Sequence, residues 1–93
     1  MEIRIGKVIH YFNRIGVAVL DLNGELQIGD TILIIGHTTD FIQHVWSMEV
    51  EHQKIPSAGP GMEVALKVSQ PARKGDEIYK VIESQAMMLA ETL

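Results

Sequence analysis

Apolar and polar residues alternate in short segments along most of the chain, and glycine or proline separates these segments. Val, Ile and Thr are frequent within them, which favours strands over helices. The pattern predicts six β-strands, at residues 2–12, 16–22, 31–35, 41–52, 63–68 and 77–82. Short strands at regular spacing with turn signals between them are typical of a sandwich or a barrel, and a closed barrel would leave no long exposed edge.

Two segments interrupt this regular pattern. Within 41–52 apolar residues occupy both alternating positions, so we expect a bulge near Ser47 that changes which face points inward. The segment 56–61 contains two prolines and two glycines. Because proline has no N–H to donate and glycine loosens the backbone, this segment is predicted to be a surface loop.

A Gly-Asp dipeptide occurs twice, each time at the start of a predicted strand. Gly29-Asp30 precedes the strand at 31–35, and Gly75-Asp76 precedes the strand at 77–82. Glycine can adopt a left-handed conformation, and aspartate can accept hydrogen bonds from nearby backbone N–H groups. We therefore predict that both pairs structure the corners at which the chain enters a strand.

The turn at 36–40 contains the two residues of the sequence that could best share a metal ion. Its flanking residues, His37 and Asp40, are predicted to hold the turn through hydrogen bonds to backbone amides. Two ligands are fewer than a zinc site requires, and His44 and His52 would lie about 26 Å apart in a continuous strand. We therefore predict neither a metal site nor a cofactor.

After Val81 the apolar residues follow a helical period. They are Ile82, Ala86, Leu89, Ala90 and Leu93. This spacing predicts a short helix at 83–91 and divides the chain into a β-barrel domain at 1–82 and a helical tail at 83–93. Such a short helix is marginal alone, so it would dock on its own barrel, on a second copy or on a partner, or else fray.

Charge is unevenly distributed along the 93 residues, which suffice for one domain. The formal net charge is −4, yet residues 15–53 hold six carboxylates and no Lys or Arg, so the cations lie near the two ends. If the first and last strands pair, these cations could form a stripe that meets phosphates, with tyrosine stacking on a base. The candidate residues for binding RNA or a partner are Lys7, Tyr11, Arg14, Arg73, Lys74 and Lys80. The alternative is that they are ordinary solvated charges along strand edges.

Catalytic motifs are absent from the sequence. The chain has no cysteine, no serine within G-x-S-x-G and no G-x-x-x-x-G-K-[ST] loop, so acyl transfer and nucleotide hydrolysis are not expected. Glu49 and Glu51 share one strand face without an apolar pocket, and we predict that the chain is not an enzyme. The apolar runs are too short to span a membrane and no signal peptide is recognisable, so we expect a cytoplasmic location and no membrane partner.

Five motifs in a fixed order carry a resemblance to a known family. They are Gly6-Lys7-Val8, the segment 24–32, Val45-Trp46-Ser47-Met48, the segment 58–61 before Val64-Ala65-Leu66, and Lys74-Gly75-Asp76 before Tyr79. Over residues 3–82 this order resembles domain 2 of elongation factor Tu. The segment 36–41 is similar to small translation elongation factor-like proteins and to the C-terminal barrel of U32 family peptidases.

The resemblance implies an all-β fold, a six-stranded antiparallel Greek-key β-barrel of the translation-factor domain 2 type. In translation factors this barrel contacts the GTPase domain and the acceptor end of aminoacyl-tRNA. Residues of the aminoacyl pocket have no match here, and the peptidases carry their catalytic apparatus in another domain, so no catalytic residue is transferred.

Two functions follow as hypotheses. The first is a non-catalytic module that docks RNA or a component of the translation or RNA-modification machinery. The second is a protein-interaction module that partners a U32-type peptidase or self-associates through the C-terminal helix, with Ile9 and Tyr11 as an apolar contact.

Overall fold

The computed structural model describes residues 1–82, and its regular structure is entirely antiparallel β-sheet. The strands are β1 (Glu2–Phe12), β2 (Val17–Leu22), β3 (Leu26–Gln27), β4 (Thr31–Ile35), β5 (Asp40–His44), β6 (Glu49–Val50), β7 (Gln53–Lys54), β8 (Ser57–Ala58), β9 (Glu63–Lys67) and β10 (Glu77–Val81). Residues 1–82 include no helix suited to crossing a bilayer. The helix expected at 83–91, and with it the helical tail at 83–93, lies outside the described residues.

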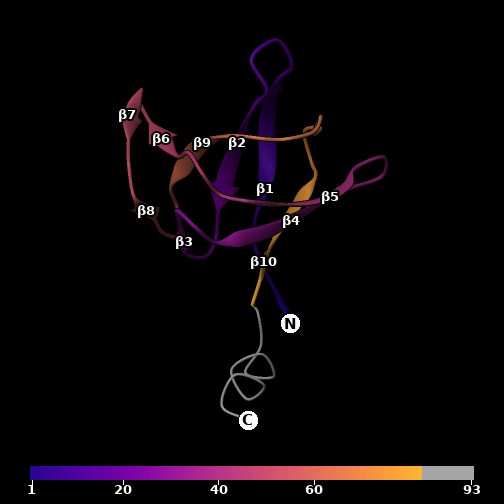
Figure 1. Ribbon diagram of the computed structural model, residues 1–93, viewed down its shortest axis with the longest axis horizontal. Helices are drawn as coiled ribbons and strands as arrows, with labels where there is room; N and C mark the ends of the chain where they lie inside the picture. Colours follow the sequence, from indigo (N-terminus) through magenta and orange to yellow (C-terminus); the bar gives the residue numbers. More distant parts are fainter. Residues whose placement is uncertain (83–93) are drawn as a thin grey trace.

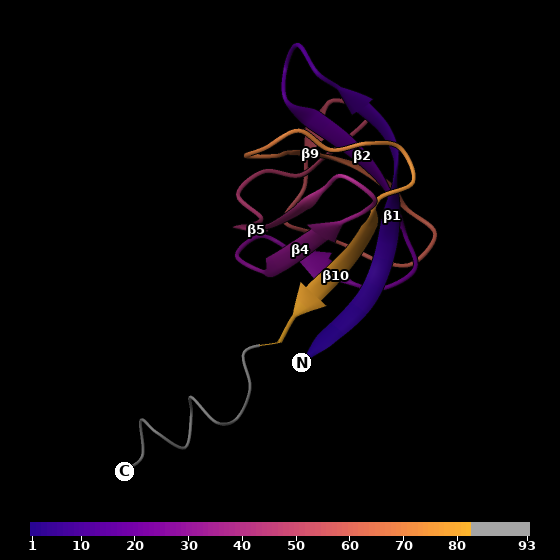
Figure 2. The same ribbon diagram turned by 90° about the vertical axis from the view of Figure 1, so that its right-hand side faces the viewer.

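Eight of the strands form one sheet, in the order β5-β4-β10-β1-β2-β9-β6-β7. The remaining two, β3 and β8, pair with each other. The first and last strands of the described chain are neighbours, because β1 pairs with β10 from Glu2 opposite Val81 to Lys7 opposite Glu77. Figures 1 and 2 show these two strands side by side. The condition set for a cation stripe, that the first and last strands pair, is therefore met.

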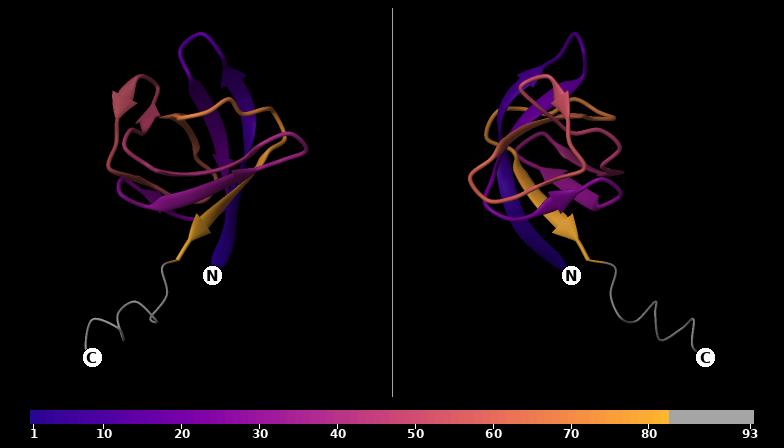
Figure 3. Two further views of the ribbon diagram at one scale, coloured as in Figure 1. Left: turned by 45° about the vertical axis from the view of Figure 1, so that its right-hand side comes forward. Right: turned by 90° about the vertical axis from the view of Figure 1, so that its left-hand side faces the viewer.

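The predicted closed six-stranded barrel is not what the structure forms. The sheet curls on itself, with β4 and β5 running crosswise to β1 and β2 (Figures 1 and 3), but its ladder ends at β5 and β7 without closing. The physical reason is that the chain leaves the ladder after His44, and a side chain spans the gap. Gln43, only 7% exposed, donates from Nε2 to the Lys67 carbonyl at 2.9 Å, and its Oε1 accepts from the Ser69 N–H at 2.7 Å.

The interior of the curled sheet is one apolar cluster. Strands β2, β4 and β9 alternate strictly, so that every second side chain points inward and is buried. The inward residues of these strands are Ala18, Leu20, Leu22, Ile32, Ile34, Val64 and Leu66. Each fully buried Leu or Ile stabilises the fold by roughly 1.5–3 kcal/mol, so this alternation accounts for much of the driving force for curling.

Strand β1 changes its inward face because its register shifts twice. The shifts lie between Arg4 and Gly6 against β10, and between Val8 and His10 against β2. Ile5 and Val8 are consequently both buried although they have opposite parity. The bulges explain why apolar residues occupy both faces of this segment in the sequence.

The turn at 27–30 contains the first Gly-Asp pair. Gly29 has a φ of 95°, and the Asp30 carboxylate accepts the Gln27 N–H at 2.9 Å. The turn also forms two backbone hydrogen bonds with the buried residue Val45. The Gly29 N–H donates to the Val45 carbonyl at 2.8 Å, and the Val45 N–H donates to the Asp30 carbonyl at 2.8 Å. The turn thereby fixes the point where the chain leaves β5.

The turn at 73–76 repeats this arrangement at the other Gly-Asp pair. Gly75 has a φ of 96°, and the Asp76 carboxylate accepts the Arg73 N–H at 2.7 Å. The Gly75 N–H donates to the Val8 carbonyl at 2.7 Å, and the Val8 N–H donates to the Asp76 carbonyl at 2.8 Å. Both strands that follow the turns, β4 and β10, pair antiparallel with each other, so the two turns are related by an approximate two-fold axis.

The segment predicted as one strand at 41–52 is two strands, β5 and β6, separated by residues 45–48. Val45 and Met48 are buried while Trp46 is 51% exposed, so the inward face does change here as expected. The interruption is longer than the single-residue bulge predicted near Ser47. The loop predicted at 56–61 is also partly wrong, because Ser57 and Ala58 lie between the prolines and pair with β3.

Candidate functional site

Two of the cations predicted to form a stripe, Lys7 and Lys80, lie beside carboxylates. Exposed Lys7 in β1 stands opposite Asp21 in β2 on one side and opposite Glu77 in β10 on the other. Arg4 forms an ion pair with Glu77 as well. Charge on this part of the sheet is therefore balanced across neighbouring strands, which favours strand pairing.

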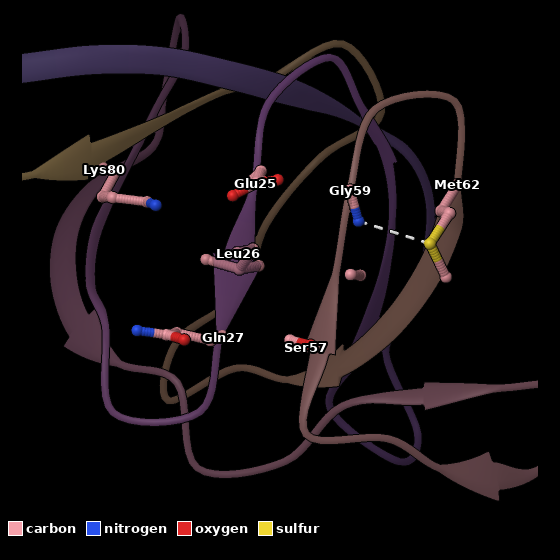
Figure 4. Close-up of a pocket in the computed structure, with 8 residues that line it drawn as sticks. Glu25, Leu26, Gln27, Ser57, Gly59, Met62 and Lys80 are labelled. Atoms are coloured by element: carbon pink, nitrogen blue, oxygen red, sulfur yellow. Dashed lines mark hydrogen bonds between the residues drawn. The ribbon is translucent and has the colours of Figure 1, made fainter.

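Lys80 lines a polar hollow of about 470 Å³ beside the β3–β8 pair, shown in Figure 4. Its Nζ lies 3.5 Å from the Asp30 carboxylate, and the two side chains are 25% and 16% exposed. Glu25 and Gln27 of the segment around β3 line the same hollow, with Ser57 of β8 across from them (Figure 4). The ion pair ties β10 to the turn at 27–30, which gives Lys80 a structural role.

Tyr11 and Arg73 come together at a second hollow of about 610 Å³, which is also lined by Thr38 and Thr39. Tyr11 is half-buried and packs against the core, as an aromatic that covers the end of the sheet does. Of the six candidate binding residues, the structure thus brings these two to one hollow and places Lys80 in another.

The remaining two candidates lie in turns. Arg14 is exposed in the turn between β1 and β2, which the Gly16 N–H closes by donating to the Phe12 carbonyl at 2.9 Å. Lys74 is exposed in the turn at 73–76.

The turn at 36–40 is closed by its backbone. The Gly36 N–H donates to the Thr39 carbonyl at 2.8 Å, and Thr39 is buried. His37 and Asp40 are both exposed. Their predicted role as side-chain acceptors and donors for backbone groups stays a prediction.

An outer face that the sequence reasoning did not single out carries a third hollow, of about 480 Å³, between β1, β2, β9 and β6. Its apolar lining consists of Phe12, Val19, Val50 and Ala65, and its polar lining of Glu49, Glu51, His52 and Glu63. We call it the acidic hollow. One signal for it was present in the sequence, namely the carboxylates without cations between residues 15 and 53.

Comparisons with curated proteins relate the chain to part of two larger proteins. It is 38% identical over 84 residues to an uncharacterized protease of Methanocaldococcus jannaschii, and 40% identical over 81 residues to a collagenase of Porphyromonas gingivalis. The alignments cover 89% and 85% of this chain but only 21% and 20% of the two relatives. The chain therefore spans about a fifth of the length of these relatives. No protein-family model matches the sequence.

Among solved structures, the crystal structure of the C-terminal domain of a Geobacillus thermoleovorans U32 peptidase has the same fold. The TM-score is 0.79, with 84% of this chain and 91% of that domain covered at 22% identity. The selenomethionine variant of that domain matches with a TM-score of 0.77, likewise at 22% identity. The predicted similarity to the C-terminal barrel of U32 peptidases is supported, and the resemblance to domain 2 of elongation factor Tu stays a prediction.

Proposed function

We propose that this chain is a non-catalytic protein-interaction module that works together with the catalytic part of a U32-type peptidase. The observation that carries the proposal is the combination of 38–40% identity to about a fifth of two proteins named for proteolysis with the fold of a U32 peptidase C-terminal domain.

The distribution of charge favours a protein partner over RNA. A nucleic-acid surface gains affinity from cations that are free to replace the counterions of phosphates. Here Arg4 is paired with Glu77, Lys80 is paired with Asp30, and Lys7 lies between two carboxylates. Tyr11 and Arg73 at their shared hollow, with Arg14 and Lys74 exposed in turns, would remain as contacts for RNA.

An association experiment tests the proposal. The chain is mixed with a U32-type peptidase from which its own C-terminal domain has been deleted, and complex formation is measured by sedimentation velocity. We expect a stable complex and no hydrolysis of gelatin by the chain alone. Hydrolysis by the isolated chain, or the absence of a complex at micromolar concentrations, would refute the proposal.

Two further measurements separate this function from the alternatives of RNA docking and self-association. Titration with tRNA at increasing salt should show no salt-sensitive binding, whereas an RNA-docking module would lose affinity steeply as salt rises. Deletion of residues 84–93 should leave capture of the peptidase unchanged if the described residues 1–82 carry the contact. Loss of capture on this deletion would show that residues 84–93 carry the contact with the peptidase.

A further inference from the structure

The acidic hollow has an apolar floor on the outside of the sheet. Val19 in β2 stands opposite Ala65 in β9, and both point away from the core because they alternate with buried neighbours. Phe12 is 46% exposed at the edge of this floor, and its ring lies 4.2 Å from that of His10. The two rings are tilted by 54° to each other, so His10 packs against Phe12 beside the floor.

Carboxylates from β6, from β9 and from the turn after β6 line this hollow. Glu63 in β9 stands directly opposite Asp21 in β2, a cross-strand pair of like charges, which is destabilising in an isolated sheet. Glu49 in β6 stands opposite Ala65. The cations closest in register are Lys7, opposite Asp21, and Lys54, opposite Glu49. The carboxylate of Glu63 thus has its nearest cross-strand neighbour of the same sign, and a bound cation would relieve the repulsion.

The wall of the hollow is a strained hairpin. Glu51 and His52 connect β6 and β7 with φ angles of 50° and 66°, in the left-handed region that glycine and asparagine usually occupy in two-residue turns. Non-glycine residues held in this backbone conformation lower the stability of the fold. The turn keeps the Glu51 carboxylate at the rim, on the same hollow as Glu49 and Glu63.

We propose that the acidic hollow binds a segment of the peptidase partner that carries lysine or arginine on either side of an apolar anchor. The inference rests on the proposed function and names the surface that performs it. The apolar anchor would cover Phe12, Val19 and Ala65, and the flanking cations would approach Glu49, Glu51 and Glu63. Charge complementarity favours a cationic partner segment, because Glu49, Glu51 and Glu63 line the hollow and would repel an acidic segment.

A peptide titration tests the chemistry directly. The probe is the fluorescein-labelled peptide Lys-Leu-Lys-Phe-Lys-Leu, and its counterparts carry Glu in place of Lys or Ser in place of the apolar residues. We expect the first peptide to bind about tenfold more tightly than either counterpart at low salt, and to weaken as salt rises. Equal binding of the acidic peptide, or of the cationic peptide without apolar residues, would overturn the proposal.

Charge reversal locates the site. The double substitution Glu49→Lys with Glu63→Lys should weaken binding of the first peptide about tenfold, since two attractions become repulsions. The control, Glu2→Lys with Glu25→Lys, changes net charge equally at exposed positions outside the hollow and should change affinity less than about twofold. Equal losses in both variants would overturn the assignment to this face. Circular dichroism melts establish that each variant is folded.

The same variants separate this inference from the proposed function. Capture of the truncated peptidase by the wild type and the control, but not by the Glu49→Lys, Glu63→Lys variant, supports both proposals. Capture that this variant retains overturns the docking face and leaves the module function standing. If no form captures the peptidase, the module function fails, and the peptide titration still decides whether the hollow binds a cationic apolar segment.

Discussion

The two Gly-Asp turns have the same backbone geometry in different surroundings. At each turn the glycine has a φ of 95° or 96°, and the aspartate accepts the backbone N–H three residues earlier. Asp76 is 4% exposed and packs against the backbone of Gly36, where an added Cβ would lie 1.9 Å from its Oδ1. Asp30 is more open and faces Lys80 at 3.5 Å.

The difference teaches that the dipeptide determines the turn while its neighbours determine how much the turn contributes to stability. A buried carboxylate that is enclosed by backbone cannot be replaced by water, so losing it leaves a donor unsatisfied. A carboxylate near the surface can be replaced by solvent. Substitutions at equivalent positions of the two turns should therefore have unequal effects.

The largest expected effect is that of Gly36→Ala. The new methyl group would overlap the Asp76 carboxylate and displace it from the Arg73 N–H, at a cost of about 2–3 kcal/mol in the free energy of unfolding. Urea denaturation measures it. In the double variant with Asp76→Ala the overlap is gone, so the two costs should fall short of additivity by about 1 kcal/mol or more. Strict additivity would show that Gly36 and Asp76 do not compete for space.

The next effect compares the two aspartates directly. Asp76→Ala should cost about 2 kcal/mol because the Arg73 N–H loses its acceptor in a buried turn, and Asp30→Ala about 1 kcal/mol because water can reach the Gln27 N–H. Chemical denaturation of both variants gives the ranking. A larger loss for Asp30→Ala would contradict the view that burial sets the contribution.

These turns belong to the part of the fold that the sequence could predict. The Gly-Asp pairs and the alternation of 17–22, 31–35 and 63–67 are local signals, and the structure has strands or turns at each of them. The strands β3 and β8 were missed because two residues are too few for alternation to appear. Closure was predicted wrongly because nothing local indicates that the Gln43 side chain would replace a backbone ladder between β5 and β9.

The candidate site was harder to predict because it depends on register between distant strands. The first and last strands do pair, as the predicted stripe required, but Lys7 faces carboxylates of both β2 and β10, and Lys80 faces one in the turn at 27–30. The acidic hollow likewise brings together residues that are far apart in the sequence, such as Phe12 and Ala65. Its carboxylates were visible as an acidic stretch, whereas the apolar floor appears only when β2, β9 and β6 are placed side by side.

A smaller effect is expected at the glycines of the turns. Gly29→Ala and Gly75→Ala should each cost about 1 kcal/mol, because an alanine is strained at a φ near 95° although both positions are open to solvent. Gly59→Ala is the matched control, since its φ is not in the left-handed region and its added Cβ meets nothing within 4 Å. This control should stay within about 0.5 kcal/mol of the wild type or be slightly stabilised. Equal melting temperatures for all three variants would show that backbone strain does not cause the loss of stability.

The smallest effect concerns the ion pair that distinguishes the turn at 27–30. Lys80→Met keeps the apolar stem and removes the charge, and it should lower the free energy of unfolding by no more than about 0.5 kcal/mol, because partly exposed pairs contribute little. The loss should shrink further at high salt. Lys67→Met is the control, an exposed position on β9 at which we expect no change. If Lys80→Met also leaves capture of the peptidase and the response to tRNA unchanged, Lys80 acts as a structural partner of Asp30. A salt-sensitive loss of RNA affinity in this variant would instead return Lys80 to the binding residues.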